Sequence, residues 1–406
     1  MNVGLEIAEL ENQIQNYPWG SKTVIADLLG EPTPSPQPQA ELWIGAHPKA
    51  PSAVRQGDRW VPLPDWIQTA PEAILGPAVA ARFHGALPFL LKVLAAAMPL
   101  SIQAHPNRAQ AMAGFARENA QAMALDASKR NYRDGSHKPE LICALTPFWG
   151  LKGFRKTAEI QQRVEQMAVP ALLEESRSLA EEDGGGLERF FRRLLTMAKS
   201  AQEKLVTEVV RAAEKLAPMD PTYEWIARLQ QSYPADIGVI SPLFLNLFEL
   251  RPGEAMFIQA RTLHAYLHGA GIELMANSDN VLRGGLTSKH IDLDELAKCL
   301  DFSQETPTLT APVVISPALS QYPTPAEEFL LSIIRVGSNT DHLSGQNRSV
   351  ELLICTDGQA VITNLGTHQS RDLKRGKAVI IPASVSQYRI TGNAVIYMAS
   401  VPGARS

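Results

Sequence analysis

The chain has 406 residues, of which 45% are hydrophobic and 20% are charged, and these fractions are typical of a folded globular protein rather than a disordered one. The formal net charge is −4 and there is no long basic run, so we expect no nucleic-acid partner. Three widely spaced cysteines, an N-terminus without a signal-peptide pattern and the absence of a long apolar run predict a cytoplasmic protein without disulfides or membrane contact.

The first 150 or so residues favour β-structure. They are rich in Pro, Gly and Trp, and their short apolar runs lie between turn signals, which is typical of an antiparallel sandwich or barrel. A helix over residues 65–75 is expected to cover one side. The stretch LPFLLKVLAAAMPLSIQAHP, residues 87–106, is apolar except for Lys92 at its centre and predicts strand buried on both faces. Gln103 and His105 are two residues apart, so on a strand they project from the same face.

A helical segment of roughly 80 residues interrupts this pattern from about Lys156. Four stretches, residues 157–167, 171–180, 187–216 and 223–233, are rich in Ala, Glu, Gln, Leu, Lys and Arg. Apolar residues recur at helical spacing along the third stretch, as one buried face requires; they are Leu194, Met197, Leu205, Val209, Ala213 and Leu216. We assign no chemistry to this insertion.

Strand patterns return at Val239, and short β-branched runs continue from about Thr306 to the C-terminal region. A helix over residues 291–299, opened by Asp292, closes the first β unit. Two β units with a helical insertion suggest a duplicated barrel. The predicted domains are residues 1–155 with 236–302, the helical insertion at 156–235, and a second β domain at 303–406.

Three strand regions carry side chains that can bind a metal. Glu140 begins the apolar run ELICAL, and His264 lies at what the pattern suggests is a strand end. Taken alone, Glu140 reads as a surface carboxylate and His264 as a hydrogen-bonded core residue. A loop at residues 269–271 is expected after His268, so a two-histidine helical zinc motif is not supported. Together with Gln103 and His105, however, Glu140 and His264 form a donor set that suits Zn²⁺.

A glycine-rich stretch at residues 271–289 places Gly284 and Gly285 between Arg283 and Lys289. This arrangement suits close backbone approach to an anion. A hairpin with a solvated arginine and lysine is the alternative interpretation. The spacing matches neither nucleotide-binding glycine motif.

Six segments carry a family resemblance: NYPWGS, ELWIGAHPKAPS, LPFLLKVL, PLSIQAHP, YRDGSHKPEL and GIELMANSDNVLRGGLTSKHID. They resemble the type I mannose-6-phosphate isomerases, which are zinc-dependent cupin enzymes. The resemblance implies a mainly β fold, with a cupin-type (jelly-roll) barrel as the catalytic domain, an inserted helical domain and a cupin-like C-terminal domain. Ala104, where valine is usual, and Ser288, where proline is usual, are minor departures that remove no ligand or charge.

The resemblance also implies the site residues. One Zn²⁺ per chain is expected, with the ligands Gln103, His105, Glu140 and His264. Arg283 would be the active-site arginine, and Ser101, Lys92 and Lys289 would lie near the substrate phosphate. The positions considered for proton transfer are matched by His137, Lys138, Glu273 and Asp279.

The implied reaction interconverts mannose 6-phosphate and fructose 6-phosphate through a cis-enediol, which requires a base near the reacting carbon and positive charge near the developing oxyanion. Glu273 is the first choice for the base because an apolar setting can raise a carboxylate pKa toward neutrality. Lys138 is the second choice. We expect a monomer whose only partner is a small hexose 6-phosphate.

Two alternatives come from other functional classes. Two histidines and a carboxylate also suit an iron-dependent cupin oxygenase, although the Arg- and Lys-bearing stretch argues against it. A non-catalytic sugar-phosphate-binding cupin would keep the same residues without turnover.

Overall fold

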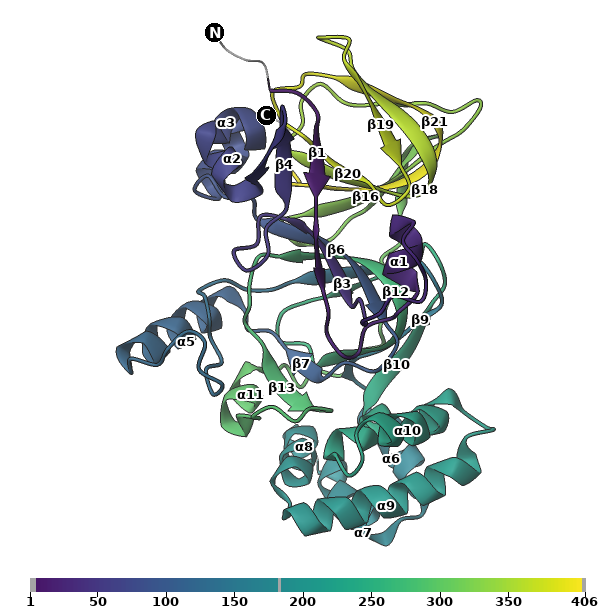
Figure 1. Ribbon diagram of the computed structural model, residues 1–406. Helices are drawn as coiled ribbons and strands as arrows, with labels where there is room; N and C mark the ends of the chain where they lie inside the picture. Colours follow the sequence, from purple (N-terminus) through teal and green to yellow (C-terminus); the bar gives the residue numbers. More distant parts are fainter. Residues whose placement is uncertain (1–4, 182–183, 404–406) are drawn as a thin grey trace.

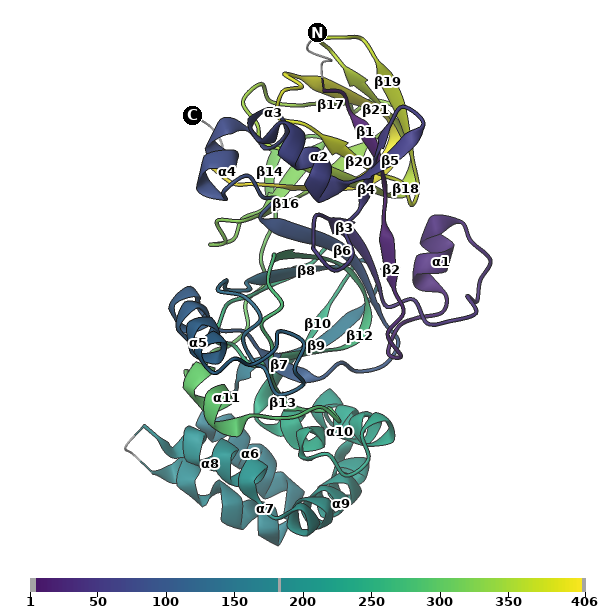
Figure 2. The ribbon, with the colours of Figure 1, turned by 60° about the vertical axis from the view of Figure 1, so that its left-hand side comes forward.

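The computed structural model describes residues 5–181 and 184–403, and its main elements are antiparallel β-sheets. Figures 1 and 2 show three parts in a row: the C-terminal strands at one end, a barrel of strands in the middle, and helices α6–α10 at the other end. Within the described residues, no helix is both long and apolar enough to cross a membrane. The three cysteines are free and buried.

The central barrel is built around one long strand, β12. Along the main path, the order of strands is β10 (Leu245–Leu250), β9 (Phe148–Phe154), β12 (His264–Ala276), β6 (Phe89–Ala96), β3 (Glu41–Gly45) and β2 (Gln13–Gln15). Four further strands join it: β7 (Ile102–Ala104), β8 (Glu140–Ala144), β11 (Ala255–Ile258) and β13 (Leu282–Gly285). Strands β6, β7, β8 and β9 all pair with β12.

A corner within β12 lets it pair with so many neighbours. Its first half, from His264, pairs with β7 and β9, whereas its second half, which carries Glu273, pairs with β6 and β8. Gly269 lies between the halves with φ +117°, a conformation that favours glycine. The loop expected at residues 269–271 is therefore a bend inside a strand, and His264 begins a strand rather than ending one.

The C-terminal strands form a second antiparallel sheet. Its order is β14 (Val313–Ser316), β15 (Leu319–Tyr322), β16 (Leu330–Val336), β21 (Tyr388–Ser400), β18 (Glu351–Asn364), β20 (Ala378–Ile381), β1 (Ala8–Glu11), β4 (Ala53–Gln56) and β5 (Arg59–Pro62), with β17 (His342–Leu343) on β21 and β19 (Ser370–Lys374) on β18. Three N-terminal strands thus complete this sheet. The predicted domain boundaries stay a prediction, and the chain between residues 8 and 62 contributes strands to both sheets.

The helical insertion contains a break between helices that the sequence pattern did not predict. Its elements are α6 (Thr157–Met167), α7 (Pro170–Glu175), η1 (Ser176–Ala180), α8 (Gly186–Thr196), α9 (Lys199–Leu216), α10 (Pro221–Ser232) and η2 (Ile237–Leu243). The stretch 187–216 is two helices, because Met197 and Ala198 adopt extended backbone, with ψ of 146° and 139°. No Gly or Pro marks this break, so the sequence pattern does not reveal it.

In the described part of the chain, six other helices flank the sheets: α1 (Val24–Leu29), α2 (Leu63–Thr69), α3 (Pro71–Leu75), α4 (Pro77–Arg82), α5 (Arg108–Ala120) and α11 (Leu293–Cys299). The helix expected over residues 65–75 is two helices, α2 and α3, which Ala70 separates. Helix α11 begins after Asp292 as predicted, and the Asp292 side chain accepts a hydrogen bond from the Glu295 amide.

The barrel shares a hydrophobic core with each neighbouring part. Leu42 and Leu91 of the barrel pack in one buried cluster with Leu331 and Ile354 of the C-terminal sheet. On the opposite side, residues of β7 and β9, including Phe154, pack in a second cluster with the helical insertion. Burial on both sides holds the barrel strands, and the side chains they carry, in fixed positions.

Candidate active site

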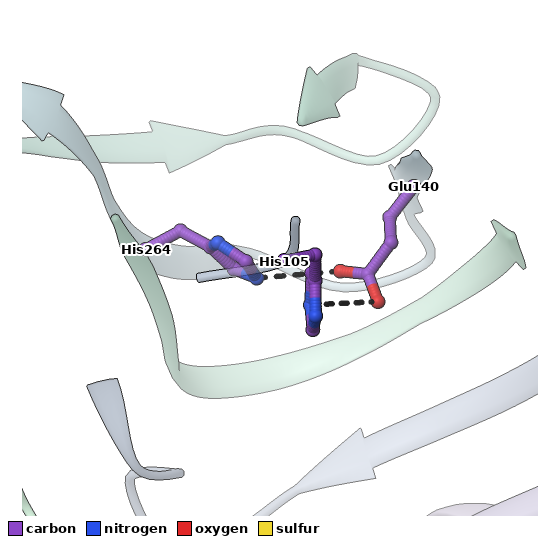
Figure 3. Close-up of side chains that lie close together, drawn as sticks. All are labelled: His105, Glu140 and His264. Carbon is purple, nitrogen blue, oxygen red and sulfur yellow. Dashed lines mark ion pairs between the residues drawn. The ribbon is translucent and has the colours of Figure 1, made fainter. Parts of the chain in front are cut away.

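Three buried side chains from separate strands meet inside the barrel (Figure 3). Glu140 begins β8, His264 begins β12 and His105 directly follows β7. Glu140 Oε1 lies 3.4 Å from His105 Nε2, and Glu140 Oε2 lies 3.3 Å from His264 Nε2. One potential ligand atom from each residue falls within 4.8 Å of the others. The predicted grouping of these three ligands is thus present in the fold.

Backbone carbonyls orient both imidazoles. His105 Nδ1 lies 2.6 Å from the Asn280 carbonyl oxygen, and His264 Nδ1 lies 2.9 Å from the Thr262 carbonyl oxygen. Since a carbonyl only accepts hydrogen bonds, each Nδ1 donates and each Nε2 presents its lone pair to the cluster. Burial, followed by the charge of Lys138, lowers the pKa of His105 to about 4, which favours the neutral ring.

The cluster fits a metal ion. Among the described residues, His105 Nε2, His264 Nε2 and Glu140 Oε2 are buried and have no hydrogen-bond partner. Buried polar atoms without partners are costly, and a divalent cation satisfies all three at once. Two imidazoles and a carboxylate are a donor set of the kind that zinc uses in catalytic sites.

Gln103, the fourth predicted ligand, lies on β7 beside this cluster. It is opposite His264 of β12 on one side and opposite Arg283 of β13 on the other. Its side chain lines the adjoining cavity. Its role as a ligand stays a prediction.

A cavity of about 430 Å³ adjoins the cluster of His105, Glu140 and His264, and its size suits a small metabolite. The structure brings most of the predicted site residues to its walls: Lys92, Ser101, Gln103, Lys138, Glu140, Glu273, Asp279, Arg283 and Lys289. His137 is not on this wall. It lines a neighbouring hollow instead, where its Nε2 lies 2.8 Å from Glu328 Oε1.

Lys138 and Asp279 are both ion-paired. Lys138 Nζ lies 2.8 Å from Glu140 Oε1. Burial alone would raise the pKa of Glu140, but Lys138 and His105 hold it well below its usual range, so the carboxylate remains charged. Asp279 Oδ2 lies 2.8 Å from Lys49 Nζ, and this contact lowers the pKa of Asp279 despite its partial burial.

Lys92 is buried between two carboxylates. Its Nζ lies 2.9 Å from Glu273 Oε2 and 3.5 Å from Glu41 Oε1. Burial raises the pKa of Glu273, and the charges of Glu140 and Glu41 add to this rise while Lys92 opposes it. The sequence interpretation missed Glu41 and Trp43, although their alternate spacing in ELWIG places both on one strand face.

Arg283 and Lys289 supply positive charge at the cavity wall. Within the described part of the chain, no ion pair neutralises either residue, and Arg133 lies on the same wall. Burial and the charge of Arg133 lower the pKa of Arg283; burial and the charge of Arg283 lower that of Lys289. Mutually repelling cations without acidic partners mark a site for an anion.

Family models match three segments of the chain. Residues 7–157 match the catalytic domain of type I phosphomannose isomerase, residues 160–245 its helical insertion domain, and residues 319–401 the cupin domain of mannose-6-phosphate isomerase. The chain belongs to the type I phosphomannose isomerase family. The cupin fold class expected from the resemblance is thereby confirmed.

Relatives of this phosphomannose isomerase family match almost the whole chain. The mannose-6-phosphate isomerase of Escherichia coli K12 is 42% identical over 391 residues, which cover 95% of this chain and 97% of that protein. The human mannose-6-phosphate isomerase is 35% identical over 402 residues, with 92% of each covered.

Two solved structures superpose on the chain with a TM-score of 0.89 and 39% identity, covering 98% of this chain and all of theirs. One is a zinc-bound mannose 6-phosphate isomerase, and the other is the Salmonella typhimurium enzyme bound to fructose 6-phosphate and zinc.

Proposed function

We propose that this chain interconverts mannose 6-phosphate and fructose 6-phosphate with one Zn²⁺. The observation that carries the proposal is the buried cluster of His105, Glu140 and His264, whose ligand atoms have no hydrogen-bond partner among the described residues. The cluster adjoins a cavity lined by Glu273, Arg283 and Lys289. The zinc and fructose 6-phosphate in the Salmonella enzyme agree with it. The chain's monomeric state and cytoplasmic location are also part of the proposal.

The metal would be held by His105, Glu140 and His264, with the Gln103 amide oxygen as the fourth ligand. Zinc bound there would act as a Lewis acid that polarises the oxygen atoms at the reacting carbons. The protein fixes the ligand geometry because carbonyl acceptors hold both imidazole rings. Lys138 keeps the Glu140 carboxylate charged through its 2.8 Å contact.

Glu273 is the residue we propose as the base. The reaction moves a proton between two neighbouring carbons, so a single carboxylate on one side of the substrate can remove it and return it. Burial raises the pKa of Glu273, which brings its basicity closer to that needed near neutral pH. Lys138 is the alternative, but its ammonium group already contacts Glu140 Oε1 at 2.8 Å.

The phosphate would be bound by Lys289 and Ser101, and the active-site arginine, Arg283, would stabilise the negative charge that develops on the substrate. Both cations lack acidic partners in the described residues, and all three line one cavity. Phosphate binding away from the reacting carbons positions them against the base. Lys92 was also predicted near the phosphate, but its ammonium group already forms ion pairs with Glu41 and Glu273. We therefore propose that its main contact is with these carboxylates.

A coupled assay with mannose 6-phosphate, before and after chelation, tests this function. We expect turnover by the purified protein, a loss of about 100-fold or more in kcat after metal removal, and recovery when zinc is added back. No turnover, or turnover that complete metal removal leaves unchanged, would contradict the proposal. Metal analysis on the same sample separates the two alternatives: iron with oxygen uptake indicates an oxygenase, and zinc without isomerisation indicates a binding protein.

A further inference from the structure

Four residues form a buried cluster beside the proposed base. Glu41 and Trp43 lie on β3, Lys92 on β6 and Glu273 on β12, and these strands are neighbours in the sheet. The register places Trp43 opposite Lys92 and Lys92 opposite Glu273. Because side chains of paired residues share a face, all three strands direct this cluster into the cavity.

Glu41 is held in place by both of its oxygen atoms. Trp43 Nε1 donates to Glu41 Oε2 at 2.7 Å, and Lys92 Nζ lies 3.5 Å from Glu41 Oε1. The Lys92 ammonium also lies 5.4 Å from the centre of the Trp43 ring, within the range of a cation–π contact. Glu41 is only 7% exposed. A buried carboxylate with these contacts is fixed rather than solvated.

The cluster contains one ammonium group and two carboxylates. An ammonium that faced Glu273 alone would form a complete buried ion pair and make that carboxylate a weak base. Glu41 shares the ammonium charge from the other side. Other groups also surround Glu273. The charge of Glu140 on β8 raises the pKa of Glu273, and the charge of Lys138, next to β8, lowers it. The Tyr266 hydroxyl comes from β12, the strand that carries Glu273.

We propose that Glu41 is a positioning residue for the isomerisation: it draws part of the Lys92 charge away from Glu273 and so keeps Glu273 basic enough to accept the substrate proton. The inference rests on the proposed function, because it requires Glu273 to be the base. Trp43 supports it by fixing the orientation of Glu41.

The test is the pH dependence of turnover in Glu41→Gln, which keeps the shape and the hydrogen-bond acceptor but removes the charge. We expect the acidic limb of the kcat/KM profile to move about one pH unit lower, because Lys92 then acts on Glu273 alone. At the optimum, kcat should fall roughly two- to fivefold because the base is weaker, while KM changes less than about twofold. The substrate phosphate, with a second pKa of about 6, titrates equally in every variant and cancels in the comparison.

Glu41→Asp is the matched control. It retains the charge, so its acidic limb should stay within roughly 0.3 pH units of the wild-type position. Zinc content and the thermal unfolding midpoint are measured for each variant. An acidic limb that does not move in Glu41→Gln, or that moves equally in Glu41→Asp, would overturn the inference.

Two further results have defined meanings. If Glu41→Gln and a second neutral variant, Glu41→Asn, both fail to fold, Glu41 serves the fold rather than the base and the inference is wrong. Glu273→Gln separates this inference from the proposed function. If Glu273→Gln loses C2 proton exchange but the acidic limb of Glu41→Gln does not move, only the role of Glu41 is overturned. If Glu273→Gln retains the exchange, the assignment of Glu273 as the base is overturned, and the role of Glu41 with it.

Discussion

Two buried glutamates in one cavity have opposite electrostatic environments. Glu140 faces Lys138 and His105, which keep its pKa well below the usual range, whereas burial and neighbouring carboxylates raise the pKa of Glu273. A low pKa suits a metal ligand because the charged form binds the cation, and a raised pKa suits a general base. We propose that the environments of Glu140 and Glu273, not their residue type, assign them to these two roles.

Glu273→Gln tests this division of roles. The amide keeps the size of the side chain and cannot accept the substrate proton, so we expect kcat to fall at least about 100-fold. Exchange of the substrate C2 proton with solvent, followed by NMR, should disappear while the zinc content stays at one per chain. Glu249→Gln, on the exposed face of β10, is the matched control and should behave as wild type. Exchange at a near-wild-type rate in Glu273→Gln would direct the search to Lys138.

The sequence indicated most of these residues because polar side chains stand out on apolar strands. Gln103, His105 and Glu273 each interrupt such a run. His137 shows the limit of this reasoning. It is adjacent to Lys138, and neighbouring residues in an extended segment project to opposite sides, so only Lys138 lines the metal-site cavity. Glu41 was missed because its partner, Lys92, is distant in the sequence.

Strand β12 is the element that joins the two halves of the site. It carries His264, one of the three candidate metal ligands, at one end and Glu273 near the other, with Gly269 between them. A side chain at Gly269 would place its Cβ 2.5 Å from the Pro147 carbonyl oxygen and 2.8 Å from the Phe148 Cα. Glycine is required here both for the positive φ and for the close approach of β9. The sequence suggested a loop because glycines usually interrupt strands.

Gly269→Ala should therefore destabilise the protein strongly. The left-handed backbone costs about 1–2 kcal/mol and the forced displacement of packed backbone about 1–3 kcal/mol more. Gly253→Ala is the matched control, because Gly253 also has positive φ, +88°, but an added methyl group there would have no described atom within 4 Å beyond its chain neighbours. Gly253→Ala should lose only the part of the unfolding free energy that comes from the left-handed backbone. Urea denaturation measures both, and equal losses for the two variants would contradict the crowding argument.

At the scale of the whole molecule, segments far apart in the chain complete one another. The short β-branched runs after Thr306 were recognisable as strands from local pattern alone. The sequence did not reveal that β1, β4 and β5 complete the sheet formed by these strands, because strand pairing between residues more than 300 positions apart leaves no local signal. The segment between β15 and β16 also reaches the edge of the candidate active site, where Glu328 contacts His137, the residue directly before Lys138.

This contact makes a further prediction about stability and pH. Glu328 Oε1 lies 2.8 Å from both His137 Nε2 and Arg108 Nη2. Burial alone would raise the pKa of Glu328, but His137 and Arg108 lower it below its usual value. A carboxyl whose pKa is lowered on folding stabilises the protein above its unfolded pKa, about 4.3, and this contribution disappears as the pH falls through the folded pKa.

We therefore expect Glu328→Gln to lose about 2 kcal/mol of unfolding free energy at pH 7, and the difference from wild type to shrink below about pH 4. Glu327→Gln is the control: its ion pair with Arg82 is exposed on both sides, so its loss should stay below about 0.5 kcal/mol. Urea denaturation at both pH values measures these differences. A loss in Glu328→Gln that persists unchanged at low pH would mean that shape, rather than charge, connects the C-terminal sheet to the segment carrying Lys138 and Glu140.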